Sequence, residues 1–199
     1  FEKRDLIRKC PSDFNSGILI IDNLLRLRLI EEEPPKLIEK IKEDTFGNLW
    51  LGGIEANGIY KFDKVSETFS RYLHDSKDQN NLIYGRLRSI YEDRSNILWI
   101  GTNLEGVSIY NPKKASNFIH HVHNSNKNSI SDGRITSINE DSSGDIWLTN
   151  TNGVVDKIDS NNNVTHFNDF KKKEQTYPTS IADLLEDKNK NILIATNNG

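Results

Sequence analysis

The chain has 199 residues, of which 35% are hydrophobic and 28% are charged, and its formal net charge is -3 at pH 7. This length suits one sizeable domain or part of a larger one. The small acidic surplus excludes a basic surface for nucleic acid, and charged residues interrupt the longest apolar stretch, 17–30, which excludes a membrane span there. The sequence has no methionine and a single cysteine, Cys10, so we expect an excised segment without an internal disulfide. We expect neither nucleic acid nor direct membrane contact for this segment.

Short strand-like segments, separated by polar turns, follow one another along the chain. The first two are GILIID from Gly17 and LLRLRLI (24–30), and in the second leucine and arginine alternate as in a half-buried strand. Next come an isoleucine-rich segment ending in Glu-Asp, one that opens with tryptophan, one that opens after a glycine, and one rich in aromatic residues. This order of four segments then recurs towards the end of the chain.

One phrase marks each recurrence. EDTFGNLW (43–50) returns as EDRSNILW (92–99), as EDSSGDIW (140–147) and, weakened, as EDKNKNIL (186–193). The aspartates of these four copies are separated by 49, 48 and 46 residues. A catalytic acid pair is seldom repeated four times at equal spacing, whereas a repeated scaffold requires such repetition. We therefore interpret these acids as structural.

Four short strands in each unit of 46 to 49 residues predict an all-β fold, a β-propeller built of four-stranded antiparallel blades. A helical repeat is the main alternative, because PTSIADLLEDK (178–188) alone has the apolar spacing of a capped helix. Its counterparts end in a turn followed by a tryptophan strand, which favours a strand here too. We expect one partial propeller domain over 1–199 with about four visible blade units. The expected units are roughly 1–33, 34–82, 83–130, 131–177 and an incomplete 178–199.

The repeated residues suit different places in a blade. An aspartate that ends the first strand accepts hydrogen bonds from backbone N–H groups of the following turn, and a glycine in that turn suits a positive φ. A tryptophan fills the wedge between neighbouring sheets, and a glycine two residues later removes a side chain where blades come close. The residues expected in these roles are Asp44, Gly47, Trp50, Asp93, Trp99, Gly101, Asp141, Gly144, Trp147 and Asp187. The fourth unit has Leu193 and Ala195 at the Trp and Gly positions, which predicts weaker packing there.

Binding residues of a propeller are expected in the loops at one end of its axis, because a rigid scaffold presents many loops around one mouth. By strand order these loops are the connectors into each first strand and the turns between the second and third strands. Their amides, carboxylates, arginines and tyrosine suit a polar ligand such as a sugar. The candidate ligand-binding residues are Tyr84, Arg86, Asn103, Glu105, Arg134 and Asn150, and Asp132 and Asn152 lie in the same loops.

The sequence offers little for catalysis or for a metal. His120, His121 and His123 form the histidine cluster, but strand alternation puts His120 on the face opposite to the other two. Their counterparts in other units are aromatic or histidine residues, which indicates packing at the outer strand. There is no phosphate-binding glycine loop and no metal or nucleophile motif. We expect no catalytic residue, no metal and no cofactor in this segment.

The repeat unit resembles the two-component regulator propeller repeat. The resemblance is clearest in IEKIKEDTFGNLWLGGIEANGIYKFD and LRSIYEDRSNILWIGTNLEGVSIYN, and it covers roughly residues 17–199. Departures include Gly53 where the repeat has threonine, Thr149-Asn150 where it has Gly-Thr, and the missing fourth tryptophan.

The resemblance implies a seven-bladed or larger propeller in the periplasmic sensor region of a hybrid two-component histidine kinase of the Bacteroidetes type. It implies that this segment is non-catalytic and contributes to detection of a polysaccharide-derived ligand and to signal transmission to a kinase. The implied partners are an oligosaccharide, other propeller and sandwich domains of the same parent chain, and a second copy in a homodimer. In that family the ligand often contacts the sandwich domain.

Two other functions stay open at this point. The segment could be part of a propeller enzyme, a lyase or hydrolase acting on carbohydrate, which would break the repeat with acid and base residues at the axial mouth. It could also be a protein-interaction scaffold, which would expose an apolar patch in the loops. The loops contain mostly polar residues and the repeat shows no such break, so the sensor is favoured.

Overall fold

The structure, a computed structural model, describes residues 18–21, 27–30, 38–53, 58–78, 80–104, 106–114, 118–126, 128–168 and 180–197. Every regular element in these ranges is a β-strand, which confirms the all-β prediction. The strands are β1 (Ile18–Ile21), β2 (Leu27–Ile30), β3 (Ile38–Glu43), β4 (Leu49–Gly53), β5 (Gly58–Asp63), β6 (Thr68–Leu73), β7 (Leu87–Glu92), β8 (Leu98–Thr102), β9 (Val107–Tyr110), β10 (Phe118–His121), β11 (Ile135–Glu140), β12 (Ile146–Asn150), β13 (Val155–Ile158), β14 (Val164–Phe167), β15 (Ile181–Glu186) and β16 (Ile192–Thr196). Among the described residues no helix is long and apolar enough to cross a membrane.

The strands form antiparallel meanders, each built from consecutive strands. Three sheets have four strands, in the orders β3-β4-β5-β6, β7-β8-β9-β10 and β11-β12-β13-β14, and are called here the first, second and third sheets. Strands β15 and β16 form a two-stranded sheet, and so do β1 and β2. The segment 178–188, for which a helix was the alternative, contains strand β15. Each sheet lies within one of the blade ranges expected from the sequence, although the blade boundaries themselves stay a prediction.

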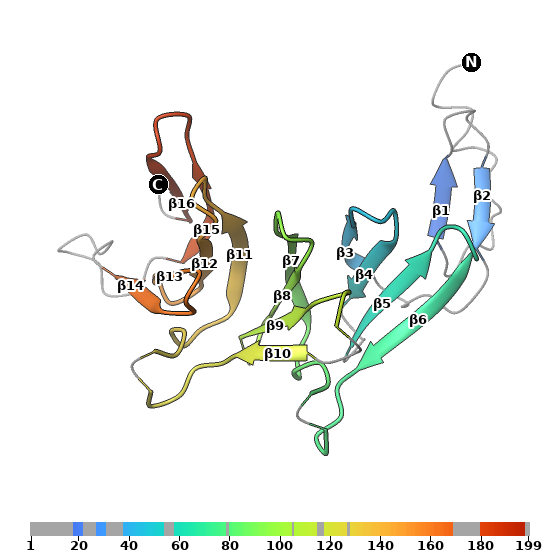
Figure 1. Cartoon of the computed structure of the whole chain (residues 1–199), viewed down its shortest axis with the longest axis horizontal. Helices are drawn as coiled ribbons and strands as arrows, with labels where there is room; N and C mark the ends of the chain where they lie inside the picture. The colour runs from blue at the N-terminus through green and yellow to red at the C-terminus, as the bar shows by residue number, and fades with distance from the viewer. Residues whose placement is uncertain are drawn as a thin grey trace.

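The sheets stand side by side through their first strands. β3 contacts β7, β7 contacts β11, and β11 contacts β15, so the first strands lie next to one another while the outer strands splay apart (Figure 1). Two glycines permit this close approach. A Cβ on Gly52 would come within 2.5 Å of the Leu87 side chain, and one on Gly101 would come within 2.7 Å of the Ile135 side chain. These contacts cross from one sheet to the next, as the sequence predicted for Gly101.

The same aspartate turn closes the first hairpin of the three four-stranded sheets and the β15–β16 hairpin. Asp141 accepts a hydrogen bond of 3.0 Å from the backbone N–H of Asp145 and another of 2.8 Å from the indole N–H of Trp147. Asp44 and Asp93 each accept an indole hydrogen bond of 2.8 Å from the tryptophan six residues later. A single carboxylate therefore fixes both the turn and the tryptophan that opens the next strand.

The tight turn requires one residue with a positive φ. Gly47 and Gly144 have φ of 85° and 91°, as expected, and Asn96 at the matching position has φ of 64°. In the fourth copy Lys190 holds this position with φ of 67°. Lysine has no special tolerance for this conformation, so the surrounding turn imposes it.

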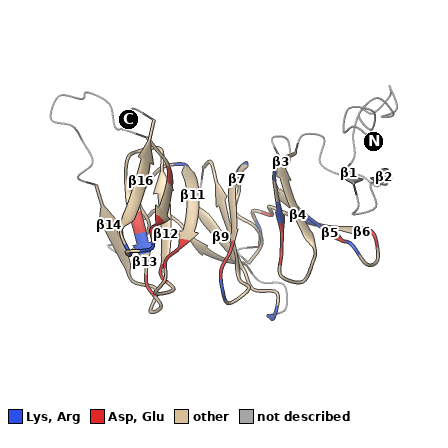
Figure 2. Ribbon diagram, turned by 90° about the horizontal axis from the view of Figure 1, so that it is seen from above, with Lys and Arg blue, Asp and Glu red and all other residues tan. Residues whose placement is uncertain are grey.

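The core lies in the wedges between sheets. Trp50 and Tyr72 of the first sheet pack on Tyr110 and Phe118 of the second, with the Trp50 and Tyr110 ring centroids 5.2 Å apart. The next wedge joins Trp99 to aliphatic residues of the third sheet, including Ile146, Leu148 and Ile158. The tryptophans fill the wedges as predicted. Charged residues of both signs are dispersed over several sheets (Figure 2).

Candidate functional site

The connectors into the first strands and the turns between second and third strands lie together, as the strand order predicts. Asn103, after β8, donates its backbone N–H to the carbonyl of Arg86, and its side-chain oxygen accepts the N–H of Arg86 at 2.7 Å. Thr151 donates its backbone N–H to the carbonyl of Arg134 at 3.0 Å in the next sheet. The candidate loops therefore continue the first hairpin of each sheet beyond its paired strands.

Several candidate side chains are occupied by bonds within the protein. The guanidinium of Arg86 pairs with the carboxylate of Glu39 on β3, which ties the second sheet to the first and holds the pKa of Glu39 below its usual value. Asn150 is almost fully buried, and its side chain accepts the backbone N–H of Asn152 at 3.0 Å. Asn103 and Asn150 shape the loops through these bonds, which leaves their polar groups less available to a ligand.

Two further candidates, Tyr84 and Arg134, lie at the surface. Tyr84 is 40% exposed and its ring meets that of His74 edge-on, with centroids 5.4 Å apart. Arg134 is exposed next to the buried first residue of β11. Glu105 lies outside the described residues. The ligand-binding role of all these residues stays a prediction.

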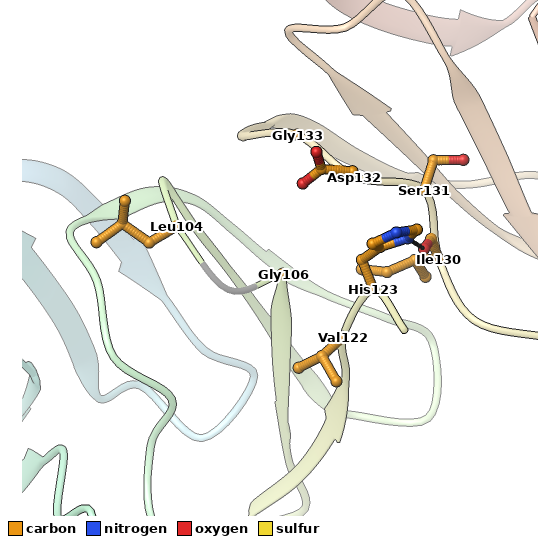
Figure 3. A pocket seen from close by; sticks show the side chains of 8 residues that line it. All are labelled: Leu104, Gly106, Val122, His123, Ile130, Ser131, Asp132 and Gly133. Atoms are coloured by element: carbon orange, nitrogen blue, oxygen red, sulfur yellow. Dashed lines mark hydrogen bonds between the residues drawn. The ribbon is translucent and has the colours of Figure 1, made fainter. Parts of the chain in front are cut away.

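A pocket of about 370 Å³ opens at this end of the second sheet (Figure 3). Its lining residues are Leu104, Gly106, Val122, His123, Ile130, Ser131, Asp132 and Gly133. The carboxylate of Asp132 points towards the side where Leu104 lies, and His123 Nδ1 bonds the carbonyl of Ile130 at 3.0 Å (Figure 3). Leu104 is 55% exposed, so the pocket presents both an apolar side chain and the carboxylate of Asp132 to solvent. This combination suits a ligand with hydroxyl groups and an apolar face.

The pocket shares Ser131 with a buried polar cluster that sequence reasoning missed. Asp156 on β13 is 1% exposed and accepts hydrogen bonds of 2.7 Å from both the backbone N–H and the hydroxyl of Ser131. His166 Nδ1 lies 2.7 Å from the Asp156 carboxylate and 3.0 Å from the Ser131 hydroxyl. The available signal was the Asp–His pair on adjacent strands, at the place where Ser108 and His120 pair at 3.2 Å in the second sheet.

The cluster of Ser131, Asp156 and His166 does not have the geometry of a nucleophilic triad. In such a triad the histidine uses one ring nitrogen for the acid and the other for the nucleophile. Here both the carboxylate and the hydroxyl meet the same nitrogen, Nδ1, so His166 has no separate nitrogen to take the serine proton. The cluster anchors the connector into β11 and thereby one wall of the pocket.

The three clustered histidines serve three different contacts. His120 lies 3.2 Å from the Ser108 hydroxyl, His121 stacks on Trp99 with ring centroids 6.1 Å apart, and His123 bonds the Ile130 carbonyl. Burial lowers the pKa of His121, so its imidazole is neutral at pH 7. Among the described residues no group of three or more His, Cys, Asp or Glu is arranged to hold a metal ion.

The glutamates of the repeated phrase link neighbouring sheets, a role that the sequence analysis did not separate from that of the aspartates. Three of the four accept a backbone N–H from the turn of the preceding sheet, across a gap of 44 to 47 residues. The pairs are Glu92 with Thr45 at 2.9 Å, Glu140 with Arg94 at 2.9 Å and Glu186 with Ser142 at 2.6 Å. The scaffold that carries the candidate loops is thus held at its opposite end by these acids.

These features define a class, a segment of a repeat-built β-propeller whose loops meet at one end. The family comparison names the repeat. Residues 80–104 match the family model described as two component regulator propeller, which confirms the resemblance seen in the sequence over that stretch. No curated protein sequence matches the chain.

Solved structures of similar fold come from two kinds of protein. The chain superposes on an extracellular domain assigned to the hybrid two component system BT3049 from B. thetaiotaomicron with a TM-score of 0.72 and 17% identity, covering 93% of this chain and 25% of that one. It also superposes on an extracellular domain assigned to a one component system, BT4673, of the same organism. The TM-score is 0.71 and the identity 23%, and the match covers 93% of this chain and 23% of that one. Virginiamycin B lyase from Staphylococcus aureus superposes with a TM-score of 0.68 and 13% identity, covering 91% of this chain and 56% of the lyase. At these identities the likeness shows the β-propeller fold.

The chain is much shorter than the solved structures that it resembles. The chain spans about a quarter of the length of the extracellular domains and about half of the lyase. Its repeats are therefore comparable to a part of each of these molecules.

Proposed function

We propose that this segment belongs to the extracytoplasmic sensor region of a two-component signalling protein and contributes to detecting a polysaccharide-derived ligand. The observation that carries the proposal is the two component regulator propeller repeat at 80–104, set in an array of sheets that superposes on the extracellular domains. The segment supplies binding and a rigid frame, and the kinase lies elsewhere in the parent chain. The proposed location is the periplasm, on the outer side of an inner-membrane protein.

The pocket at the loop end supports binding of a polar ligand. Asp132 offers an exposed carboxylate for sugar hydroxyls, and Leu104 and Val122 offer an apolar surface for one face of a sugar ring. The Asp156 cluster buries the other side of this connector, so the acid is presented from a fixed backbone. Other propeller and sandwich domains of the parent, and a second copy in a dimer, are the proposed protein partners.

Two measurements test this proposal. The coding sequence of the parent should continue into a membrane span and a kinase core, and a soluble parent without either would contradict it. Calorimetric titration of the parent's extracytoplasmic region with polysaccharide fragments should give binding that Asp132→Asn weakens by roughly ten-fold, since a charged hydrogen bond is lost. Glu43→Gln, at the opposite end of the sheets, is the matched control and should leave the affinity unchanged.

A carbohydrate lyase or hydrolase is the competing proposal, because lyases share this fold at 13–15% identity. An enzyme should turn over a polysaccharide and lose turnover when the acid at the loop end, Asp132, is changed. In the sensor, by contrast, incubation with the same fragments should leave them intact while they bind. Product formation that depends on Asp132 would decide for the enzyme.

A further inference from the structure

We propose that the outer part of the wedge between the second and third sheets binds a small aromatic anion. The site, called here the outer pocket, is centred on Trp99, Ile109, Ile119 and His121 of the second sheet and has a volume of about 630 Å³. Ligand pockets of drug-sized molecules have about 300–1,000 Å³. The outer pocket is separate from the loop end, so this proposal stands whether or not the segment senses an oligosaccharide.

The repeat itself shows what this face normally carries. In the first sheet Trp50 pairs with Lys61, whose ammonium lies 5.9 Å from the centre of the indole ring, and Lys61 pairs with Ser70. The third sheet repeats the arrangement: Trp147 pairs with Lys157, at 5.3 Å, and Lys157 pairs with Thr165. A cation over the indole and a hydroxyl beyond it keep the outer half of both faces polar.

The second sheet departs from this pattern at both positions. Trp99 pairs with Ile109, and Ile109 pairs with Ile119. An isoleucine thus replaces the lysine, and a second one, 58% exposed, replaces the hydroxyl residue. An exposed isoleucine does not help solubility, and the other two sheets fold with polar residues at these positions. The isoleucines are therefore not needed for the fold of a sheet. The change is local and produces a continuous apolar surface beside Trp99.

The facing wall is also smaller than its counterpart. In the first wedge, Tyr110 and Phe118 fill the space opposite Trp50, together with Tyr72 from the same sheet as the tryptophan. The corresponding residues of the second wedge are Ile158, Val164 and His121, as the strand pairing of the third and second sheets shows.

That correspondence rests on the ladder registers. Leu98 pairs with Tyr110 and Tyr110 with Phe118, just as Ile146 pairs with Ile158 and Ile158 with Val164. Aliphatic side chains therefore replace two rings on the facing wall. The outer pocket opens beside this wedge, and its lining residue from the third sheet is Asn162.

The polar groups of the outer pocket determine the charge of its ligand. The pocket lining includes Asn80, Asn111, Asn162 and Lys114, and Lys114 is the single Lys or Arg among the lining residues. Lys114 is exposed, and His121 is neutral at pH 7 because burial lowers its pKa. A flat ring would lie on Ile109 and Ile119, and an anionic group would face the Lys114 ammonium, with the amides as further hydrogen-bond donors.

Anilinonaphthalene sulfonate, which joins an aromatic ring system to an anion, is the probe. Its fluorescence titration against the 199-residue chain should show one dominant site. The double variant Ile109→Lys with Ile119→Ser restores the residues of the first sheet and should weaken binding at least about ten-fold. Leu193→Ser, at a leucine that is 52% exposed outside the pocket, is the control and should bind as the unchanged chain does. Far-UV circular dichroism and the urea midpoint check that each variant is folded.

The charge preference has its own matched pair. Lys114→Gln should weaken sulfonate binding roughly three-fold, whereas Lys113→Gln, one residue away and outside the pocket lining, should not. Anilinonaphthalene without the sulfonate should be insensitive to Lys114→Gln. Equal effects of the two lysine variants, or unchanged binding in the double variant, would overturn the proposal. So would light scattering that shows Ile119-dependent dimers, because the face would then be a contact between copies.

Discussion

Two hairpins with the same turn, β11–β12 and β15–β16, differ in how firmly they are anchored. Asp141 and Asp187 accept equivalent turn hydrogen bonds of 3.0 and 2.8 Å from the backbone N–H four residues later. Trp147, however, is 9% exposed, bonds to Asp141 and stacks on Phe167, whereas Leu193 at the matching position is 52% exposed. The turn is a local device that forms in both hairpins. The tryptophan is what couples a turn to the rest of its sheet.

Replacing the tryptophan should produce the largest difference between the two hairpins. Trp147→Ala removes a buried ring and one partner of Asp141, and large-to-small changes of this kind cost about 3–5 kcal/mol of unfolding free energy. Leu193→Ala removes an exposed side chain and should cost about 0.5 kcal/mol or less. Urea unfolding followed by circular dichroism measures both. Equal losses would mean that the indole does not anchor the third sheet.

The aspartates should give the next largest effect. Asp141→Ala leaves the indole N–H of Trp147 and the turn N–H groups without their acceptor, for an expected loss of about 1–3 kcal/mol. Asp187→Ala loses only exposed turn bonds, so its effect should be clearly smaller. The difference between the two variants in urea unfolding reports the tryptophan bond together with the longer contact of Asp141 with Lys157. In a background that already carries Trp147→Ala, Asp141→Ala should cost no more than Asp187→Ala. That result would establish the energetic coupling between Asp141 and Trp147.

Acid should weaken the turn that Asp141 closes in the β11–β12 hairpin. Burial alone would raise the pKa of Asp141, but hydrogen bonds from the Trp147 indole and from turn N–H groups outweigh it and hold the pKa below the ordinary 3.8. A carboxyl whose pKa is lowered by folding stabilises the fold above its unfolded pKa, and this stability is lost as pH falls through the folded pKa. We expect the unfolding free energy to fall below about pH 4. Asp141→Asn should flatten this decline, and an unchanged pH profile would refute the assignment.

The fold could be predicted from the sequence because its signals are periodic. The spacing of Asp44, Asp93, Asp141 and Asp187 predicted the repeat, and the turn roles of Gly47 and Gly144 followed from local chemistry. Lys190 at a positive φ could not be predicted, because the turn imposes that conformation on an unsuited residue. The strand assignment of 181–186 needed the repeat as context, since its apolar spacing alone suits a helix.

The candidate site was less predictable, because its polar groups are shared between units. Arg86 and Asn150 were chosen by position in the loops, but their side chains are bound by Glu39 and by the Asn152 backbone. The pocket instead centres on Asp132 and on a connector held by Asp156, a residue that stands where another sheet has serine. Position in a repeat identifies the loop, whereas the differences between copies identify the residues with distinct roles.

The smallest expected change in stability concerns the glutamates of the repeated phrase. It distinguishes a glutamate that links two sheets from one that contacts only its own sheet. Glu140 binds the backbone N–H and guanidinium of Arg94 in the preceding sheet, whereas Glu43 pairs with Lys64 in its own sheet at 2.6 Å. Glu140→Gln keeps the shape but removes the charge, so a loss of about 1 kcal/mol is expected, and Glu43→Gln should change stability by about 0.5 kcal/mol or less.

Hydrogen exchange of the Arg94 amide is the measurement that separates the contact from a general loss of stability. In Glu140→Gln this amide should exchange faster relative to amides of the β7–β8 ladder, because its acceptor lies in the next sheet and is weakened selectively. Glu43→Gln should leave the ratio unchanged. A uniform increase across the second sheet would instead show a general loss of stability and would contradict a specific link between Glu140 and the Arg94 amide.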